Sequence, residues 1–192
     1  MAAKPSHPRV LGIDPGTRVV GWGIVERDGP RLTAVAHGTL RADGRESIDI
    51  RLARIAAQLR EVIAEHAPTQ ASIEEAFYGR DAKAAQRLGE GRGAIVLVLA
   101  EAGLPVAHYA NNVVKKALTG HGRATKDQVA AMLRRVLGLD EAPASRDASD
   151  ALALAVCHHQ RPETPGAGGV PPRLAAAIQA ARARDAGRKS RR

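Results

Sequence analysis

The sequence predicts an α/β fold in which a mixed five-stranded sheet carries helices on its faces. Three short apolar stretches with strand character follow one another near the N-terminus, before any helical pattern begins. Beyond residue 46, helical and strand patterns alternate, which is typical of a sheet extended through helical connections. No apolar run approaches the roughly 20 residues that a membrane-spanning helix needs.

The expected strands are short and are bounded by turn residues. Pro15-Gly16 ends the first strand, and Asp28-Gly29 is a hairpin signal between the second and the third. The two later strands are separated from them by helical segments. The expected strands cover residues 10–14, 19–25, 32–40, 70–77 and 104–109.

The helical segments show apolar residues at helical spacing. They cover residues 47–65, 81–102, 111–118, 125–137 and 147–159. The helix over 81–102 contains Gly89, Gly91 and Gly93, and each is unfavourable there by up to about 1 kcal/mol relative to Ala. We therefore expect another backbone to approach this helix closely at its glycines.

The chain divides into a flexible N-terminus (1–8), a folded body (9–160) and a tail (161–192) that begins with a Pro/Gly-rich linker. The net charge is +9, and the tail holds eight basic residues against two acidic ones. The tail is therefore either a solvated, disordered segment or one that adds non-specific affinity for phosphate. A single cysteine, Cys157, and no secretion signal favour a cytoplasmic protein.

Two carboxylates stand at the ends of expected strands. Asp14 precedes Pro-Gly, where an Asp commonly caps the turn that it begins. Glu74 lies between apolar neighbours, where burying a carboxylate is costly unless a cation or hydrogen-bond donors accompany it. A salt bridge would also explain Glu74, and strand alternation does not distinguish it from Glu75.

Asp147 and Asp150 are three residues apart at the start of the last helix, so they share one helical face. Acidic residues there also oppose the helix dipole, and either Asp147 or Ser145 could be the N-cap. Four carboxylates at the ends of elements in one small sheet nevertheless indicate a site for Mg²⁺, which prefers oxygen ligands. His158 and His159 fall late in this helix, where we expect them in the core or on the surface.

Four segments of the body form an ordered set: Leu11-Gly-Ile-Asp-Pro-Gly-Thr17, Gly21-Trp-Gly23, Ile73-Glu-Glu-Ala-Phe77 and Asp147-Ala-Ser-Asp-Ala-Leu-Ala153. In this order they resemble the RuvC family of Holliday junction resolvases. The likeness implies a ribonuclease H-like fold and a homodimer that cuts four-way DNA junctions by paired symmetric nicks, in recombination and repair. It also implies Mg²⁺ or Mn²⁺, 5′-phosphate products and a branch-migration motor of the RuvA and RuvB type as partner.

The resemblance also implies roles for individual residues. The expected metal ligands and catalytic carboxylates are Asp14, Glu74, Asp147 and Asp150. The resemblance places Phe77 against bases at the junction, although packing in the core would also explain an aromatic there. It makes Lys126 a catalytic and phosphate-binding residue. Lys115 is expected to bind phosphate too, and its neighbour Lys116 could take that role.

Two other functions stay open from the sequence. Gly12-Ile-Asp-Pro-Gly-Thr17 is similar to the phosphate loop of actin-like ATPases and sugar kinases, although those proteins need a second domain and a second loop. A DNA-binding module without catalysis would use the basic residues alone. The presence of all the expected acidic residues argues against that second alternative.

Overall fold

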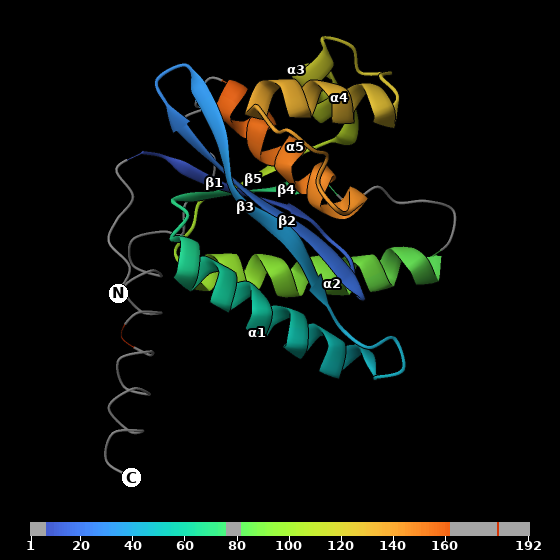
Figure 1. The fold of residues 1–192 in the computed structure, drawn as a ribbon. Coiled ribbons are helices and arrows are strands. Elements are labelled where there is room, and N and C mark those ends of the chain that lie inside the picture. The colour runs from blue at the N-terminus through green and yellow to red at the C-terminus, as the bar shows by residue number, and fades with distance from the viewer. Residues whose placement is uncertain (1–6, 76–81, 162–179, 181–192) are drawn as a thin grey trace.

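The computed structural model describes residues 7–75, 82–161 and 180 (Figure 1). A sheet lies in the middle, helices α1 and α2 cover one face, and α3, α4 and α5 lie on the other side. The strands are β1 (Arg9–Asp14), β2 (Val19–Asp28), β3 (Arg31–Arg41), β4 (Gln70–Glu74) and β5 (Val106–Tyr109). The helices are α1 (Ile48–His66), α2 (Ala82–Glu101), α3 (Asn111–Thr119), α4 (Lys126–Leu137) and α5 (Arg146–Gln160).

The sheet has the strand order β3-β2-β1-β4-β5, so β1 is its central strand. β1 pairs antiparallel with β2 and parallel with β4, which makes the sheet mixed as the sequence predicts. Val10, Leu11 and Ile13 are fully buried, as expected of a strand that is covered on both faces. The β2–β3 hairpin turns at Gly29, whose φ of 55° lies in the left-handed region that glycine adopts readily.

Two of the expected strands are longer than those observed. The strand expected over 70–77 ends at Glu74, and residues 76 and 77 lie outside the described part of the chain. The strand expected over 104–109 begins at Val106, because Pro105 has no N–H to donate to a neighbouring strand. Its carbonyl still accepts a hydrogen bond of 2.8 Å from the backbone N–H of Ala71.

Helix α5 lies directly on β1 and β2 because glycines occupy the contact positions. A Cβ atom at Gly12 would collide with the carbonyl of Ala151 and lie 2.9 Å from the backbone nitrogen of Ala155. One at Gly21 would collide with the backbone of Asp147. The helix is consequently buried along most of its length. Its buried residues are Ala148, Ala151, Leu152, Ala153, Leu154, Ala155, Val156 and Cys157.

The opposite face of the sheet packs against α1 and α2 through large aliphatic side chains. Among the described glycines, only Gly91 brings a helix of this face close to the chain beside the sheet, in the loop after β1, as described below. The largest fully buried members of the cluster are Leu11, Ile13, Ile24, Ile55, Leu59, Ile73, Ile95 and Leu99.

None of the helices in the described residues is long and apolar enough to cross a membrane.

The prediction of close approach at the glycines of α2 is confirmed at one position only. A Cβ atom at Gly91 would lie 2.9 Å from Thr17 Cγ2 and 3.0 Å from the carbonyl oxygen of Gly16. At Gly89 and Gly93 no atom of the described chain lies within 4 Å of the Cβ position, so the prediction stays untested there. Both glycines are on the exposed side of the helix, where this chain offers them no neighbour.

The two histidines at the end of α5 join the helix to the sheet, as the core interpretation expects. His158 Nδ1 lies 2.7 Å from the Tyr109 hydroxyl, and its Nε2 lies 2.8 Å from Gln70 Oε1. His159 Nε2 lies 2.9 Å from the carbonyl oxygen of Val25. Burial lowers the pKa of His159, so its ring is neutral at physiological pH and donates to that carbonyl.

Candidate active site

Asp14 and Glu74 leave the sheet side by side. β1 and β4 are parallel neighbours with Ile13 opposite Ile73, so the next residue of each strand lies at the same edge. Glu74 is half-buried and lines a pocket, whereas Glu75 is exposed and does not line it. Because β4 ends at Glu74, Glu74 lines the pocket and Glu75 does not. Strand alternation alone could not make this distinction.

Asp147 and Asp150 come from the first turns of α5. Ser145 is the N-cap, and its hydroxyl accepts a 3.0 Å hydrogen bond from the backbone N–H of Ala148. Asp147 is therefore free of the capping role that the sequence left open. Gly21, the pairing partner of Asp14 on β2, leaves room for the Asp147 backbone directly beside Asp14.

The four carboxylates act electrostatically as one group. Burial and then repulsion from Glu74, Asp150 and Asp147 raise the pKa of Asp14 to about 7, and a hydrogen bond with Glu74 adds to the effect. Burial also raises the pKa of Asp150, while Lys126 opposes that shift. A proton shared within the group therefore offsets part of its charge near neutral pH.

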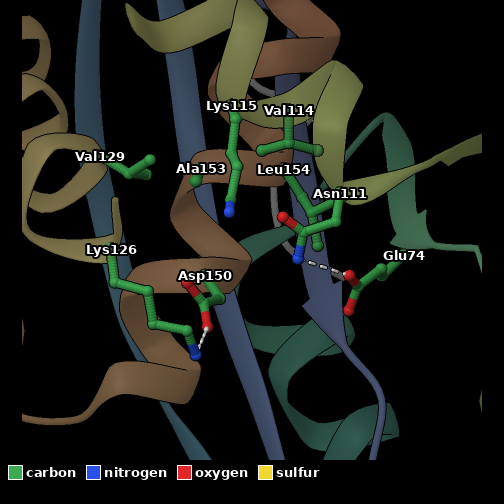
Figure 2. Close-up of a pocket in the computed structure, with 9 residues that line it drawn as sticks. All are labelled: Glu74, Asn111, Val114, Lys115, Lys126, Val129, Asp150, Ala153 and Leu154. Atoms are coloured by element: carbon green, nitrogen blue, oxygen red, sulfur yellow. Dashed lines mark hydrogen bonds and ion pairs between the residues drawn. The ribbon is translucent and has the colours of Figure 1, made fainter. Parts of the chain in front are cut away.

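The carboxylates face two lysines across the pocket. Figure 2 shows Lys115 from α3 and Lys126 from α4 pointing toward Asp150, with Lys126 Nζ 4.0 Å from Asp150 Oδ2. Lys116 is exposed and does not line the pocket. The complete lining is Glu74, Asn111, Val114, Lys115, Lys126, Val129, Asp150, Ala153 and Leu154.

Lys126 owes its position to a capping box at the start of α4. The Thr125 side chain accepts from the backbone N–H of Gln128 at 3.3 Å, and the Gln128 side chain accepts from the N–H of Thr125 at 2.9 Å. These reciprocal bonds fix the helix start. Lys126, as the first residue of the helix, is thereby held at the mouth of the pocket.

Two residues of the site escaped the sequence analysis. Asn111 Nδ2 donates a 2.9 Å hydrogen bond to Glu74 Oε1, and Arg92 Nε donates a 3.2 Å hydrogen bond to the Glu74 backbone carbonyl. Neither contact leaves a periodic signal in the sequence. The role of Gly21 was also missed, although glycine within a strand signals close approach of another backbone.

The donor set of the pocket suits a hard divalent cation, because its acidic ligands are all carboxylate oxygens. Within residues 7–75, 82–161 and 180, no three Asp, Glu, His or Cys side chains are arranged to hold an ion as they stand. The pKa of Asp14 is raised first by burial and then by the neighbouring negative charges, and a bound cation would offset both effects. Phe77, the expected base-stacking residue, lies outside the described residues.

A family model described as "Crossover junction endodeoxyribonuclease RuvC" matches residues 10–158. A protein of that name from Magnetococcus marinus is 45% identical over 81% of this chain and 86% of its own length. One from Parvibaculum lavamentivorans is 49% identical over 77% of this chain and 84% of its own length. The solved structure of T. thermophilus RuvC in complex with Holliday junction substrate matches with a TM-score of 0.75 and 37% identity, covering 80% of this chain and 93% of that one.

Proposed function

The chain belongs to the RuvC family of crossover junction endodeoxyribonucleases, and from that premise we propose that it cuts four-way DNA junctions by metal-dependent phosphodiester hydrolysis. Its fold is the ribonuclease H-like fold that the resemblance implied. The observation that carries the proposal is the group of carboxylates around Asp14, whose pKa is raised to about 7 by burial and then by the charges of the other three. The proposed metal ligands are Asp14, Glu74, Asp147 and Asp150.

Mg²⁺ is the proposed ion, and Mn²⁺ substitutes for it because both prefer oxygen ligands. When bound, such ions would supply water activation for attack on the scissile phosphate and stabilisation of the leaving 3′ oxygen, so that the other product would carry a 5′-phosphate. The carboxylates hold the ions at the sheet edge. Because burial and the neighbouring charges raise the pKa of Asp14, a cation bound there would displace the proton that Asp14 holds near neutral pH.

The lysines bind the DNA backbone in this proposal. Lys126 and Lys115 reach the carboxylates from separate helices, so a phosphate entering the pocket meets positive charge on the side opposite Glu74. Lys116 is exposed beside the pocket, where it adds affinity for the neighbouring phosphates. Phe77 would stack on an unpaired base at the junction centre, three residues beyond a metal ligand.

Paired nicks need two active sites, and we assign the dimer contact to the exposed side of α2. Gly89, Gly93 and Leu97 follow one another at four-residue spacing, so they form one strip on the helix. Leu97 is 58% exposed, the largest exposed fraction among the large hydrophobic residues that the structure describes. A second copy packed on this strip would bury Leu97 and bring two pockets onto one junction.

The ends of the chain complete the proposal. The body spans residues 9–160, and the basic tail over 161–192 adds non-specific affinity for phosphate. The enzyme works in the cytoplasm, where its DNA substrate and a branch-migration motor of the RuvA and RuvB type are found. Deleting residues 163–192 should flatten the salt dependence of junction binding and leave cleavage at low salt intact.

A synthetic mobile four-way junction with Mg²⁺ tests the central proposal, with linear duplex of the same sequence as the control. We expect symmetric nicks that DNA ligase seals, since ligase requires a 5′-phosphate. Asp14→Asn, Glu74→Gln and Asp150→Asn should abolish cleavage, while junction binding in Ca²⁺ survives. Normal cleavage by any of these variants would refute the assignment of the metal ligands.

A further inference from the structure

Glu74 is held at both of its ends by residues from different helices. The Asn111 amide binds one carboxylate oxygen, Oε1, at 2.9 Å, and Figure 2 shows the Asn111 side chain directed at Glu74. On the other side of the sheet, Arg92 from α2 binds the backbone carbonyl at 3.2 Å. We propose that Asn111 and Arg92 are positioning residues that hold Glu74 ready to bind a divalent cation. This inference rests on the proposed function.

Asn111 is not engaged in the role that an Asn at a helix start usually has. The N-cap of α3 is Ala110, and no side chain caps the helix. The carbonyl of Ala110 accepts from the backbone N–H groups of Val113 and Val114 at 2.9 and 3.2 Å. The Asn111 amide is therefore available to Glu74, and helix capping does not explain its position.

An amide is well suited to this task because it carries no charge. A lysine or arginine in its place would neutralise Glu74 and compete with the cation. The Asn111 N–H fixes the direction of one carboxylate oxygen and leaves the negative charge and the second oxygen available. The charge of Glu74 contributes to the raised pKa of Asp14, so the two carboxyl groups lie near each other.

Asn111 and Arg92 lie on helices that packing holds in place. Val114 and Leu118 are buried beneath α3, and Val114 lines the pocket together with Asn111. On α2, Gly91 precedes Arg92 and lies against the loop that follows Asp14. One turn of α2 thus contacts the chain next to Asp14 and binds the carbonyl of Glu74. These contacts keep the two residues in place before an ion arrives.

The test measures Mn²⁺ binding to the full-length protein without DNA, by the electron paramagnetic resonance signal of free Mn²⁺. Partners of metal ligands typically change metal affinity by about 10–100-fold when mutated. We expect the dissociation constant to rise about 10-fold in Asn111→Ala and in Arg92→Gln. Asn112→Ala is the matched control, because Asn112 is exposed, does not line the pocket and should leave Mn²⁺ binding unchanged.

Cleavage kinetics separate positioning from general damage. In Asn111→Ala the Mn²⁺ concentration for half-maximal cleavage should rise about 10-fold, while kcat at saturating Mn²⁺ stays within about 3-fold of the parent. Arg92→Lys keeps the charge and an N–H donor, so it should retain more Mn²⁺ affinity than Arg92→Gln. Thermal unfolding of each metal-free variant verifies that it is folded.

Glu74→Gln separates the positioning role of Asn111 and Arg92 from the assignment of Glu74 as a metal ligand. If Glu74→Gln weakens Mn²⁺ binding but Asn111→Ala and Arg92→Gln do not, the positioning role is refuted and the metal site stands. If Glu74→Gln leaves Mn²⁺ binding unchanged, the metal assignment itself fails. Equal weakening by Asn112→Ala would show a non-specific effect of altering α3, and that result would also refute the inference.

Discussion

The two faces of the sheet are packed in different ways. On the α5 face, glycines of β1 and β2 let a helix backbone touch the strands, and two carboxylates of the site come from that helix. On the α1–α2 face, large aliphatic side chains such as Ile55 and Leu59 fill the interface. Backbone contact fixes the position of a helix closely, whereas aliphatic packing chiefly supplies burial. We therefore expect substitutions on the α5 face to affect catalysis and those on the other face to affect stability.

Among the packing positions, the most severe change should be Gly21→Ala, because the added methyl group collides with the Asp147 backbone and lies 2.9 Å from its Cβ. The first turn of α5 must move, and Asp147 moves with it. We expect junction cleavage to fall at least about 100-fold and stability to fall by about 1–3 kcal/mol. Single-turnover cleavage and urea unfolding measure the two effects. Near-normal cleavage would show that the distance between α5 and the sheet does not position the site.

Leu59→Ala should produce the opposite pattern on the α1–α2 face. Leu59 is fully buried, so its truncation leaves a cavity that costs about 2–4 kcal/mol. At 25 °C the molecules that remain folded should cleave junctions within about 3-fold of the parent rate, since the pocket lies on the other face. Comparing cleavage per folded molecule with the urea midpoint tests this. A large catalytic defect in folded protein would contradict the division between the faces.

Asp14→Asn should abolish cleavage and yet stabilise the metal-free protein. The pKa of Asp14 is about 7 in the folded state against a model value of 3.8, so the unfolded chain loses this proton at lower pH. The free energy of unfolding of the parent consequently falls as pH rises from about 4 to about 7, and the loss is complete above about pH 7. We expect the variant to gain about 1–2 kcal/mol at pH 8 in EDTA, and nothing below about pH 4.

Urea unfolding across this pH range measures the gain, with saturating Mg²⁺ as the second condition. Bound cation stabilises only the parent, so Mg²⁺ should reduce or reverse the difference. A gain that does not depend on pH would show that repulsion among the carboxylates is not its source.

Ser72→Ala tests the one buried polar residue among those described, a residue fully buried opposite Gly12 on the α5 face. The Ser72 hydroxyl has no hydrogen-bond partner in the described part of the chain. Replacing it with a methyl-sized side chain should be neutral or stabilise by up to about 1 kcal/mol. Urea unfolding gives the value. Destabilisation by more than that would indicate a bound water molecule at this position.

The smallest effect is expected at Gly93→Ala. Nothing lies within 4 Å of its Cβ position, so within one chain the substitution should stabilise α2 by about 0.5–1 kcal/mol. Analytical ultracentrifugation, together with thermal unfolding at several protein concentrations, also tests the dimer. Weaker association of the variant would indicate that a partner backbone lies against this strip of α2.

The sequence predicted the features that depend on local periodicity, such as strands and helices. It did not predict contacts between elements that are distant in the chain. Among the described residues, the apolar patterns located every strand and helix of the sheet fold, and the ordered segments supplied Asp14 and Asp150 as candidate site residues. Glu74 could not be separated from Glu75 by alternation, since that choice depends on where β4 ends. A helical glycine has the same local pattern whether it is packed or exposed, so the sequence could not tell that Gly91 contacts this chain and Gly93 does not. The Asn111 contact joins side chains 37 residues apart, and no local pattern encodes it.

The position of α5 at the end of the ordered elements has a consequence for biosynthesis. Of the described elements, the one that ends in Asp14 is synthesised first, and the one that carries Asp147 and Asp150 is synthesised last. Chains grow at about 5–20 residues per second, so several seconds pass between the synthesis of β1 and that of α5. Until α5 is made and packed on the sheet, the growing chain lacks two of the four proposed metal ligands.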